Sequence, residues 1–152
     1  MNMKRGLYVG LFLLLAGCAG RGNQKQADTV VSDVSAKETI EVPSDSGVVR
    51  MVLTGGHGEM LIRKEPRNPV YLEFKTGNYR KVSAEIIPQS DSVANIRISQ
   101  VVLPDGTMDG PFGRTVEYDI PSPGILRLVI GESLMQGDPW GGVFRAEVTL
   151  TE

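Results

Sequence analysis

The feature that most constrains the fold is an alternation of apolar and polar side chains in the second two thirds of the chain. In the stretch VYLEF, Val70, Leu72 and Phe74 alternate with Tyr71 and Glu73. The same period of two recurs at residues 48–53, 81–87, 94–100, 115–120, 125–130 and 143–150. Successive side chains of an extended chain point to opposite faces, so this period predicts strands with one buried and one solvated face.

Turn-forming residues separate these runs. They are Gly55-Gly56, Asn68-Pro69, Gly77-Asn78, Pro104-Asp105-Gly106, residues 121–124 and Asp138-Pro139. Strands at this spacing, about seven to nine of them without a long helical pattern, predict an all-β fold, a single sandwich or barrel. The alternation favours antiparallel pairing, because the strands of parallel sheets are usually buried on both faces.

The first 17 residues have the order of a secretory signal. Lys4 and Arg5 precede an uncharged apolar run at residues 7–15, which is too short for a transmembrane helix of about 20 residues. The junction LAGC, residues 15–18, resembles the lipobox of bacterial lipoprotein precursors. This resemblance implies cleavage before Cys18 and attachment of lipid to its sulfur. The alternative is an ordinary secretory cut beside a buried or free cysteine.

The sequence therefore predicts three segments. Residues 1–17 are a signal peptide, and residues 18–46 are the lipidated Cys18 with a flexible linker, which begins rich in glycine and amide side chains. Residues 39–42 are a candidate edge strand that the following Pro43 interrupts. Residues 47–152 remain, roughly enough for one domain with its own core.

Composition limits the compartment and the partners. Cys18 is the only cysteine, so the predicted domain has no internal disulfide and depends on packing. Loss of Lys4 and Arg5 with the signal leaves 14 basic against 18 acidic residues, a balance that argues against nucleic-acid binding. Ala19 follows Cys18 where an inner-membrane retention signal has aspartate. We therefore expect a lipoprotein of the outer membrane that faces the periplasm.

Three stretches resemble those of a known group of sandwiches. They are VYLEFKTGNYRKVSAEI at residues 70–86, QVVLPDGTMDG at residues 100–110 and VEYDIPSPGILRLVIG at residues 116–131. Their strand and turn order is similar to that of bacterial pre-peptidase C-terminal-type domains, a jelly-roll-like group whose architecture the goose-type lysozyme inhibitors share. The resemblance implies a jelly-roll-like β-sandwich.

No residue pattern predicts an enzyme. His57 is the only histidine, and it cannot by itself form a His-rich metal site. A Ser-His-Asp triad with His57 as the base is formally open, but no serine stands in a Gly-x-Ser-x-Gly pattern. Residues 56–58 are interpreted as a hairpin tip. Since no Gly-rich phosphate loop is present either, we expect no catalytic residue and no cofactor.

Asp105 and Asp109 are the candidate ligands for a calcium ion, because carboxylates are hard oxygen ligands. Their spacing lacks the alternate ligands and the distal glutamate of an EF-hand loop. Two neighbouring Asp-containing turns explain them equally well, so the sequence does not predict a metal site.

Two loops carry the candidate binding residues. Residues 131–142 are long for a hairpin connection and contain Met135 and Trp140, and long loops on rigid scaffolds often bind partners. If the loop with Met108 and Phe112 lies at the same end of the sandwich, the two loops form a binding rim. The alternative is that Trp140 folds back and closes one end of the sandwich.

Two functions of different class follow. The first is a non-enzymatic lipoprotein that presents the sandwich in the cell envelope to a protein or envelope partner. The second, implied by the resemblance, is inhibition of a lysozyme by a loop that enters the cleft with the catalytic carboxylates. The matching turn keeps Ser122, Gly124 and Arg127, but it has Pro123 before the glycine and no tyrosine after it.

Charged side chains on the predicted solvated faces form a further pattern. Arginines on some strands stand against glutamates on others, which predicts cross-strand ion pairs. The residues are Arg50, Arg80, Arg97, Arg127 and Arg145, with Glu73, Glu85, Glu117 and Glu147.

Overall fold

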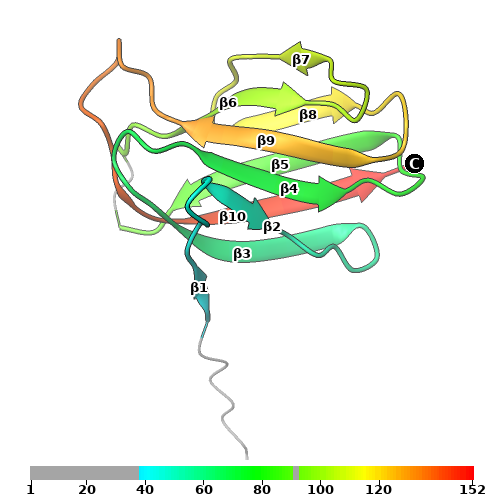
Figure 1. Cartoon of the computed structure of the whole chain (residues 1–152), viewed down its shortest axis with the longest axis horizontal. Helices are drawn as coiled ribbons and strands as arrows, with labels where there is room; N and C mark the ends of the chain where they lie inside the picture. The colour runs from blue at the N-terminus through cyan, green and yellow to red at the C-terminus, as the bar shows by residue number, and fades with distance from the viewer. Residues whose placement is uncertain (1–37, 91–92) are drawn as a thin grey trace, which may run out of the picture. The chain divides into compact units, whose positions relative to one another are not determined.

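A computed structural model describes residues 38–90 and 93–152, which form a sandwich of two five-stranded sheets (Figure 1). The strands are β1 (Ile40–Glu41), β2 (Val48–Arg50), β3 (His57–Lys64), β4 (Val70–Lys75), β5 (Lys81–Pro88), β6 (Arg97–Val102), β7 (Met108–Asp109), β8 (Thr115–Asp119), β9 (Ile125–Gly131) and β10 (Gly142–Thr151). The predicted signal peptide, Cys18 and most of the predicted linker lie outside the described residues. Within the described part, no helix is long and apolar enough to cross a membrane.

The strand order is that of a jelly roll. The first sheet has the order β1-β3-β10-β5-β8 and the second β2-β4-β9-β6-β7. The chain passes from one sheet to the other after most strands from β3 onward, and these eight strands pair antiparallel, as expected. The sheets are nevertheless mixed, because β1 and β2 join their edges in parallel with β3 and β4.

The core lies where the predicted apolar faces meet. All inward positions of the predicted runs from residue 70 onward are buried except Tyr118, which is half-buried on edge strand β8. The most completely buried apolar side chains are Ile62, Leu72, Ile98, Val101, Leu126, Leu128, Ile130, Phe144 and Val148, each at 0% exposure. Period-two alternation therefore identified seven of these nine side chains, whereas Ile62 and Val101 lie outside the predicted runs.

Strand β3 is a feature that the sequence did not predict. His57 is its first residue, so the interpretation of residues 56–58 as a hairpin tip was wrong. The tip is Gly55-Gly56, with φ angles of 59° and 81° that suit a two-residue hairpin turn. The alternation in β3 is weak, since Gly58 and Lys64 occupy two of its inward positions.

The described sandwich also begins earlier than the predicted boundary at residue 47. β1 pairs with Leu61 and Ile62 of β3, and the Arg145 guanidinium lies 3.0 Å from the Glu38 carboxylate. A turn closed by the Gly47 amide and the Ser44 carbonyl then leads to β2 on the other sheet. Of the candidate edge strand at residues 39–42, Ile40 and Glu41 thus form a strand, because the neighbouring β3 supplies the hydrogen bonds.

Leu126→Ala should lower the free energy of unfolding by about 2–5 kcal/mol, because it leaves a cavity between the sheets. Its neighbour Ile125 is 55% exposed on the same strand, so Ile125→Ala should lower it by about 1 kcal/mol or less. Urea unfolding of both variants measures the difference. Equal losses would contradict the assignment of the two faces.

Candidate functional site

A buried ion pair stands at the base of the loop between β9 and β10. Lys64 ends β3 on its inward side and is 1% exposed. Its Nζ lies 2.6 Å from Glu132 Oε1 and also donates to the carbonyl oxygens of Glu65 at 3.0 Å and Trp140 at 3.2 Å. All three ammonium protons therefore have acceptors, which a buried charge requires.

Glu132 has a second hydrogen bond in this cluster. The backbone amide of Arg67, which has a left-handed φ of 64°, donates to Glu132 Oε1 at 2.9 Å. Burial by itself raises the pKa of Glu132, but the hydrogen bonds from Lys64 and Arg67 together with the positive charge of Lys64 lower it below its ordinary value of 4.5. Glu132 is therefore a carboxylate at neutral pH.

Asn95, in the connection between β5 and β6, holds the same loop. Its side-chain amide donates to the carbonyl oxygens of Ser133 and Asp138, both at 3.0 Å, and its Oδ1 accepts the Ser133 amide at 3.0 Å. These bonds fix two points of the loop that are five residues apart. Together with the contacts of Lys64 to Glu132 and to the Trp140 carbonyl, they hold both ends of the 132–141 loop.

Trp140 packs back onto the sandwich. It is half-buried against the core, and a Cβ added at Gly142 would lie 2.6 Å from its ring. Gly142 thus leaves the space that the indole occupies. Of the two arrangements predicted for Trp140, the structure therefore has the one in which the side chain folds back and closes one end of the sandwich.

The tip of the loop carries two exposed apolar side chains. Leu134 and Met135 are the central residues of a turn that the Gln136 amide closes on the Ser133 carbonyl at 3.0 Å. Their exposed fractions are 76% and 98%. Beside Leu134 lies a depression of about 480 Å³ that Arg67 also lines. Met135 was a predicted site residue and Leu134 was not, although both are apolar residues of the same predicted loop.

The predicted partners Met108 and Phe112 do not complete this rim. Met108 lies on β7, at the edge of the second sheet, which is separate from the loop after β9 in Figure 1. Phe112 is half-buried and packs edge-to-face on Tyr118, with ring centroids 6.1 Å apart. Phe112 therefore packs at the edge of the sandwich and is not available as a projecting loop residue.

Asp105 and Asp109 accept hydrogen bonds from neighbouring backbone amides, and Asp109 also accepts one from β8. Asp105 Oδ1 accepts the Thr107 amide at 2.9 Å, and Asp109 accepts the Gly110 amide at 2.7 Å and the Tyr118 hydroxyl at 3.0 Å. The bond to Asp109 raises the pKa of Tyr118. Across residues 38–90 and 93–152, no group of three or more histidine, cysteine, aspartate or glutamate side chains could hold a metal ion.

Ser122 and Arg127 occupy different surfaces. Ser122 lies in the 121–124 turn, which the buried Thr76 holds through mutual hydrogen bonds with Gly124 of 2.9 Å. Arg127 lies within β9, where its Nη2 is 2.6 Å from Glu73 Oε1 and its guanidinium stands over the Tyr71 ring. The structure therefore does not bring these two predicted residues together on one loop.

Among the described residues, the predicted cross-strand ion pairs form on the second sheet, whereas on the first sheet Arg145 pairs with Glu38, which precedes β1. Glu73 lies between Arg127 and Arg50, whose Nε is 3.5 Å from its carboxylate. On the outer face of the other sheet, Glu147 lies opposite both Glu59 and Glu85. The register places like charges side by side there, so the expected arginine partners are absent at these positions.

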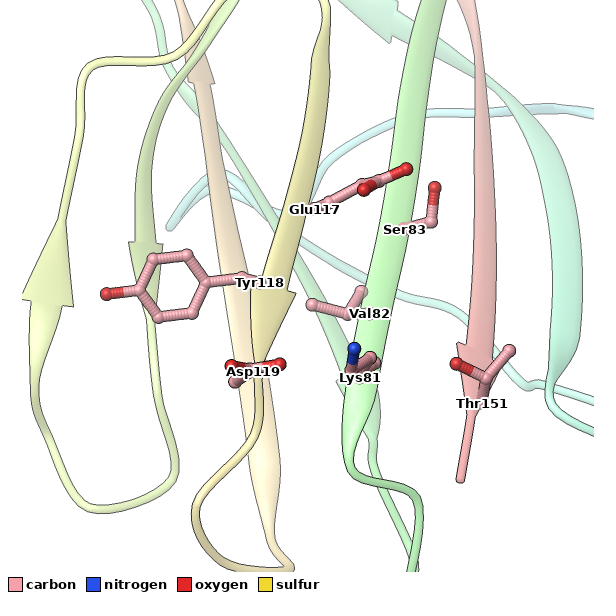
Figure 2. A pocket seen from close by; sticks show the side chains of 7 residues that line it. All are labelled: Lys81, Val82, Ser83, Glu117, Tyr118, Asp119 and Thr151. Atoms are coloured by element: carbon pink, nitrogen blue, oxygen red, sulfur yellow. The ribbon is translucent and has the colours of Figure 1, made fainter.

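A shallow hollow of about 720 Å³ lies on the outer face of β5, β8 and the end of β10 (Figure 2). Lys81 stands opposite Asp119, and Ser83 opposite Glu117, while the Tyr118 ring points away from the hollow. These four facing side chains are exposed. Pockets that bind small molecules usually enclose their ligand, and this one does not.

Comparison with known proteins identifies solved structures of similar fold but does not assign the chain to a family. No protein-family model matches the chain, and no curated protein matches it. PliG of Aeromonas hydrophila, a periplasmic lysozyme inhibitor of g-type lysozyme, superposes with a TM-score of 0.51 at 9% identity, covering 74% of this chain and 100% of that one. PliG of Salmonella Typhimurium gives 0.43 at 11% identity, covering 67% and 98%. At these identities the likeness concerns the fold alone.

Glu132→Gln should lower the free energy of unfolding at pH 7 by about 3–5 kcal/mol, because Lys64 is left buried without its counter-charge. The folded-state pKa of Glu132 is lowered, so its contribution is complete above pH 4.5 and is lost as the pH falls through that lowered pKa. Urea unfolding from pH 7 to pH 3 should show the gap between wild type and variant closing in acid. Exposed Glu117→Gln is the control, and a constant gap for Glu132→Gln would contradict the role of the ion pair.

Proposed function

We propose that this chain is a non-enzymatic binding module of the cell envelope, and that it engages a protein partner through the 132–141 loop. The observation that carries the proposal is the exposed Leu134–Met135 turn on a base clamped by Lys64 and Asn95. A clamped loop loses little conformational entropy on binding, and projecting apolar side chains gain free energy by filling a pocket on a partner.

The predicted lipid on Cys18 would hold the module at a membrane. One acyl chain binds a bilayer only marginally, whereas two or more anchor it stably. Residues 19–37 would then connect the anchor to the sandwich, with a reach of at most roughly 65 Å if fully extended. We place the module on the periplasmic side of an outer membrane, where it would be free to meet a partner within that distance.

The double variant Leu134→Ser, Met135→Ser should lose partner binding by at least tenfold, on the order of 1.4 kcal/mol or more. Both side chains are exposed, so the melting temperature should stay within about 2 °C of wild type. The measurement is capture from envelope extract by the full chain, followed by titration of the captured protein. Met108→Ser, an exposed methionine on β7, is the matched control. Equal affinity of the double variant and wild type would contradict the proposal.

A second candidate function is inhibition of a g-type lysozyme. It is favoured by the fold shared with the Aeromonas protein and by the clamped 121–124 turn, beside which Arg80 and Lys75 supply positive charge. Arg80 Nη1 lies 3.4 Å from the Pro121 carbonyl, and Lys75 stands opposite Ile125, the residue after the turn. A fixed turn flanked by cations suits a cleft that contains catalytic carboxylates.

Titration of a g-type lysozyme with the full chain tests this second function. Inhibition should reach completion near one equivalent, and Arg80→Ala should weaken it by about tenfold while Leu134→Ser, Met135→Ser leaves it unchanged. Lysozyme activity that is unaffected by an excess of the chain would remove this candidate without bearing on the 132–141 loop.

A further inference from the structure

The pairing of β2 with β4 leaves part of the edge of the second sheet open. The Tyr71 amide donates to the Gly47 carbonyl and the Met51 amide to the Glu73 carbonyl, both at 2.9 Å. In a parallel pair, alternate residues direct their backbone groups to the neighbouring strand. The backbone N–H and C=O groups of Val49 and Met51 therefore point toward β4. Those of Arg50 and Val52, the residues on either side of Met51, point away from the sheet.

Arg50 and Val52 are accessible to solvent, in contrast to the preceding Val48, whose backbone also points outward. The preceding Val48 exchanges hydrogen bonds with Ser44, which covers its backbone. No hydrogen bond within the described part of the chain reaches the backbone of Val52. The Arg50 side chain is 80% exposed and Val52 is 85% exposed. This edge therefore offers main-chain donors and acceptors to another strand.

The opposite edge of the sandwich is protected. Just before β8 the Arg114 carbonyl accepts the Ile86 amide of β5, and just after it the Ile120 amide donates to the Arg80 carbonyl. The odd-numbered residues of β8 therefore direct their backbone outward. Those residues include Glu117 and Asp119, and charged side chains on an edge disfavour pairing with another strand. The edge at Arg50 and Val52 carries a single charge, of the opposite sign, and an exposed valine.

A hollow beside this edge adds a place for a side chain. It measures about 390 Å³ and lies where the chain after β2 diverges from β4. Its apolar lining residues are Met51, Val52, Leu53, Phe74 and Ile125. Its charged lining residues are Arg50, Lys75 and Glu73, of which Glu73 is already paired with Arg127 and Arg50. The rim is therefore positively charged overall.

We propose that this edge binds an extended, acidic segment of a partner protein by β-strand addition. The segment pairs with the main chain of Arg50 and Val52, an aliphatic side chain enters the hollow against Ile125, and carboxylates face Arg50 and Lys75. Main-chain bonds supply affinity in this mode of recognition, and the pockets for alternate side chains supply specificity. The surface is distinct from the 132–141 loop and does not depend on it.

The test uses the ¹⁵N-labelled full chain in detergent micelles, titrated with an acetylated and amidated hexapeptide of alternating glutamate and valine. The amide resonances of Arg50 and Val52 should shift saturably, and the same peptide with lysine for glutamate should bind at least tenfold more weakly. Val52→Pro removes the outward N–H while keeping the Met51–Glu73 bond, since proline is tolerated on an edge that faces solvent. It should weaken binding at least tenfold, whereas the isosteric Val52→Thr should stay within about threefold of wild type.

Melting curves of both variants establish that the fold is kept. Equal binding of the acidic peptide by Val52→Pro and Val52→Thr would overturn the proposal, as would equal binding of the acidic and basic peptides. Shifts at Arg50 and Val52 that grow with protein concentration in the absence of peptide would also overturn it, because they would identify a second copy of this chain as the occupant.

Discussion

Every other feature of this protein depends on the contact between the apolar faces of two sheets. Leu128 and Ile130 of one sheet and Phe144 and Val148 of the other are fully buried, and each such side chain contributes about 1.5–3 kcal/mol. The chain has a single cysteine, Cys18, so no internal disulfide supplements this contact. Stability resides in the strands, and the loops and edges can carry function.

The two open sides of the sandwich are closed by different means. On one side, residues 40–50 pair first with β3 and then with β4, so one segment joins both edges. On the other side, the hydrogen bond between Tyr118 and Asp109 connects β8 to β7, and Phe112 packs against the tyrosine ring. Exposed main chain remains after β2, where the chain leaves the sheet. The second proposed binding surface lies at this exposed main chain.

The ion pair of Lys64 and Glu132 converts a strand end into a support for a loop. A lysine on an inward position would destabilise a sandwich, but here it satisfies one carboxylate and two carbonyl groups of the loop and the adjoining turn. Asn95 adds a second support from a different sheet connection. The exposed Leu134 and Met135 are therefore positioned by polar contacts of the neighbouring loop residues, and not by contacts of their own side chains.

The sequence by itself determined the all-β class, the inward face of seven runs and the turns between them, because these follow from a period of two and from local turn chemistry. It did not determine β3, whose alternation is broken by Gly58 and Lys64, or the pairing of Lys64 with Glu132, since nothing local relates residues 68 positions apart. Tertiary structure alone decided that Trp140 and Phe112 pack inward, that Arg127 belongs to a sheet face, and that Leu134 is exposed. Each of these depends on which strands become neighbours, and that is set by the packing of the whole chain.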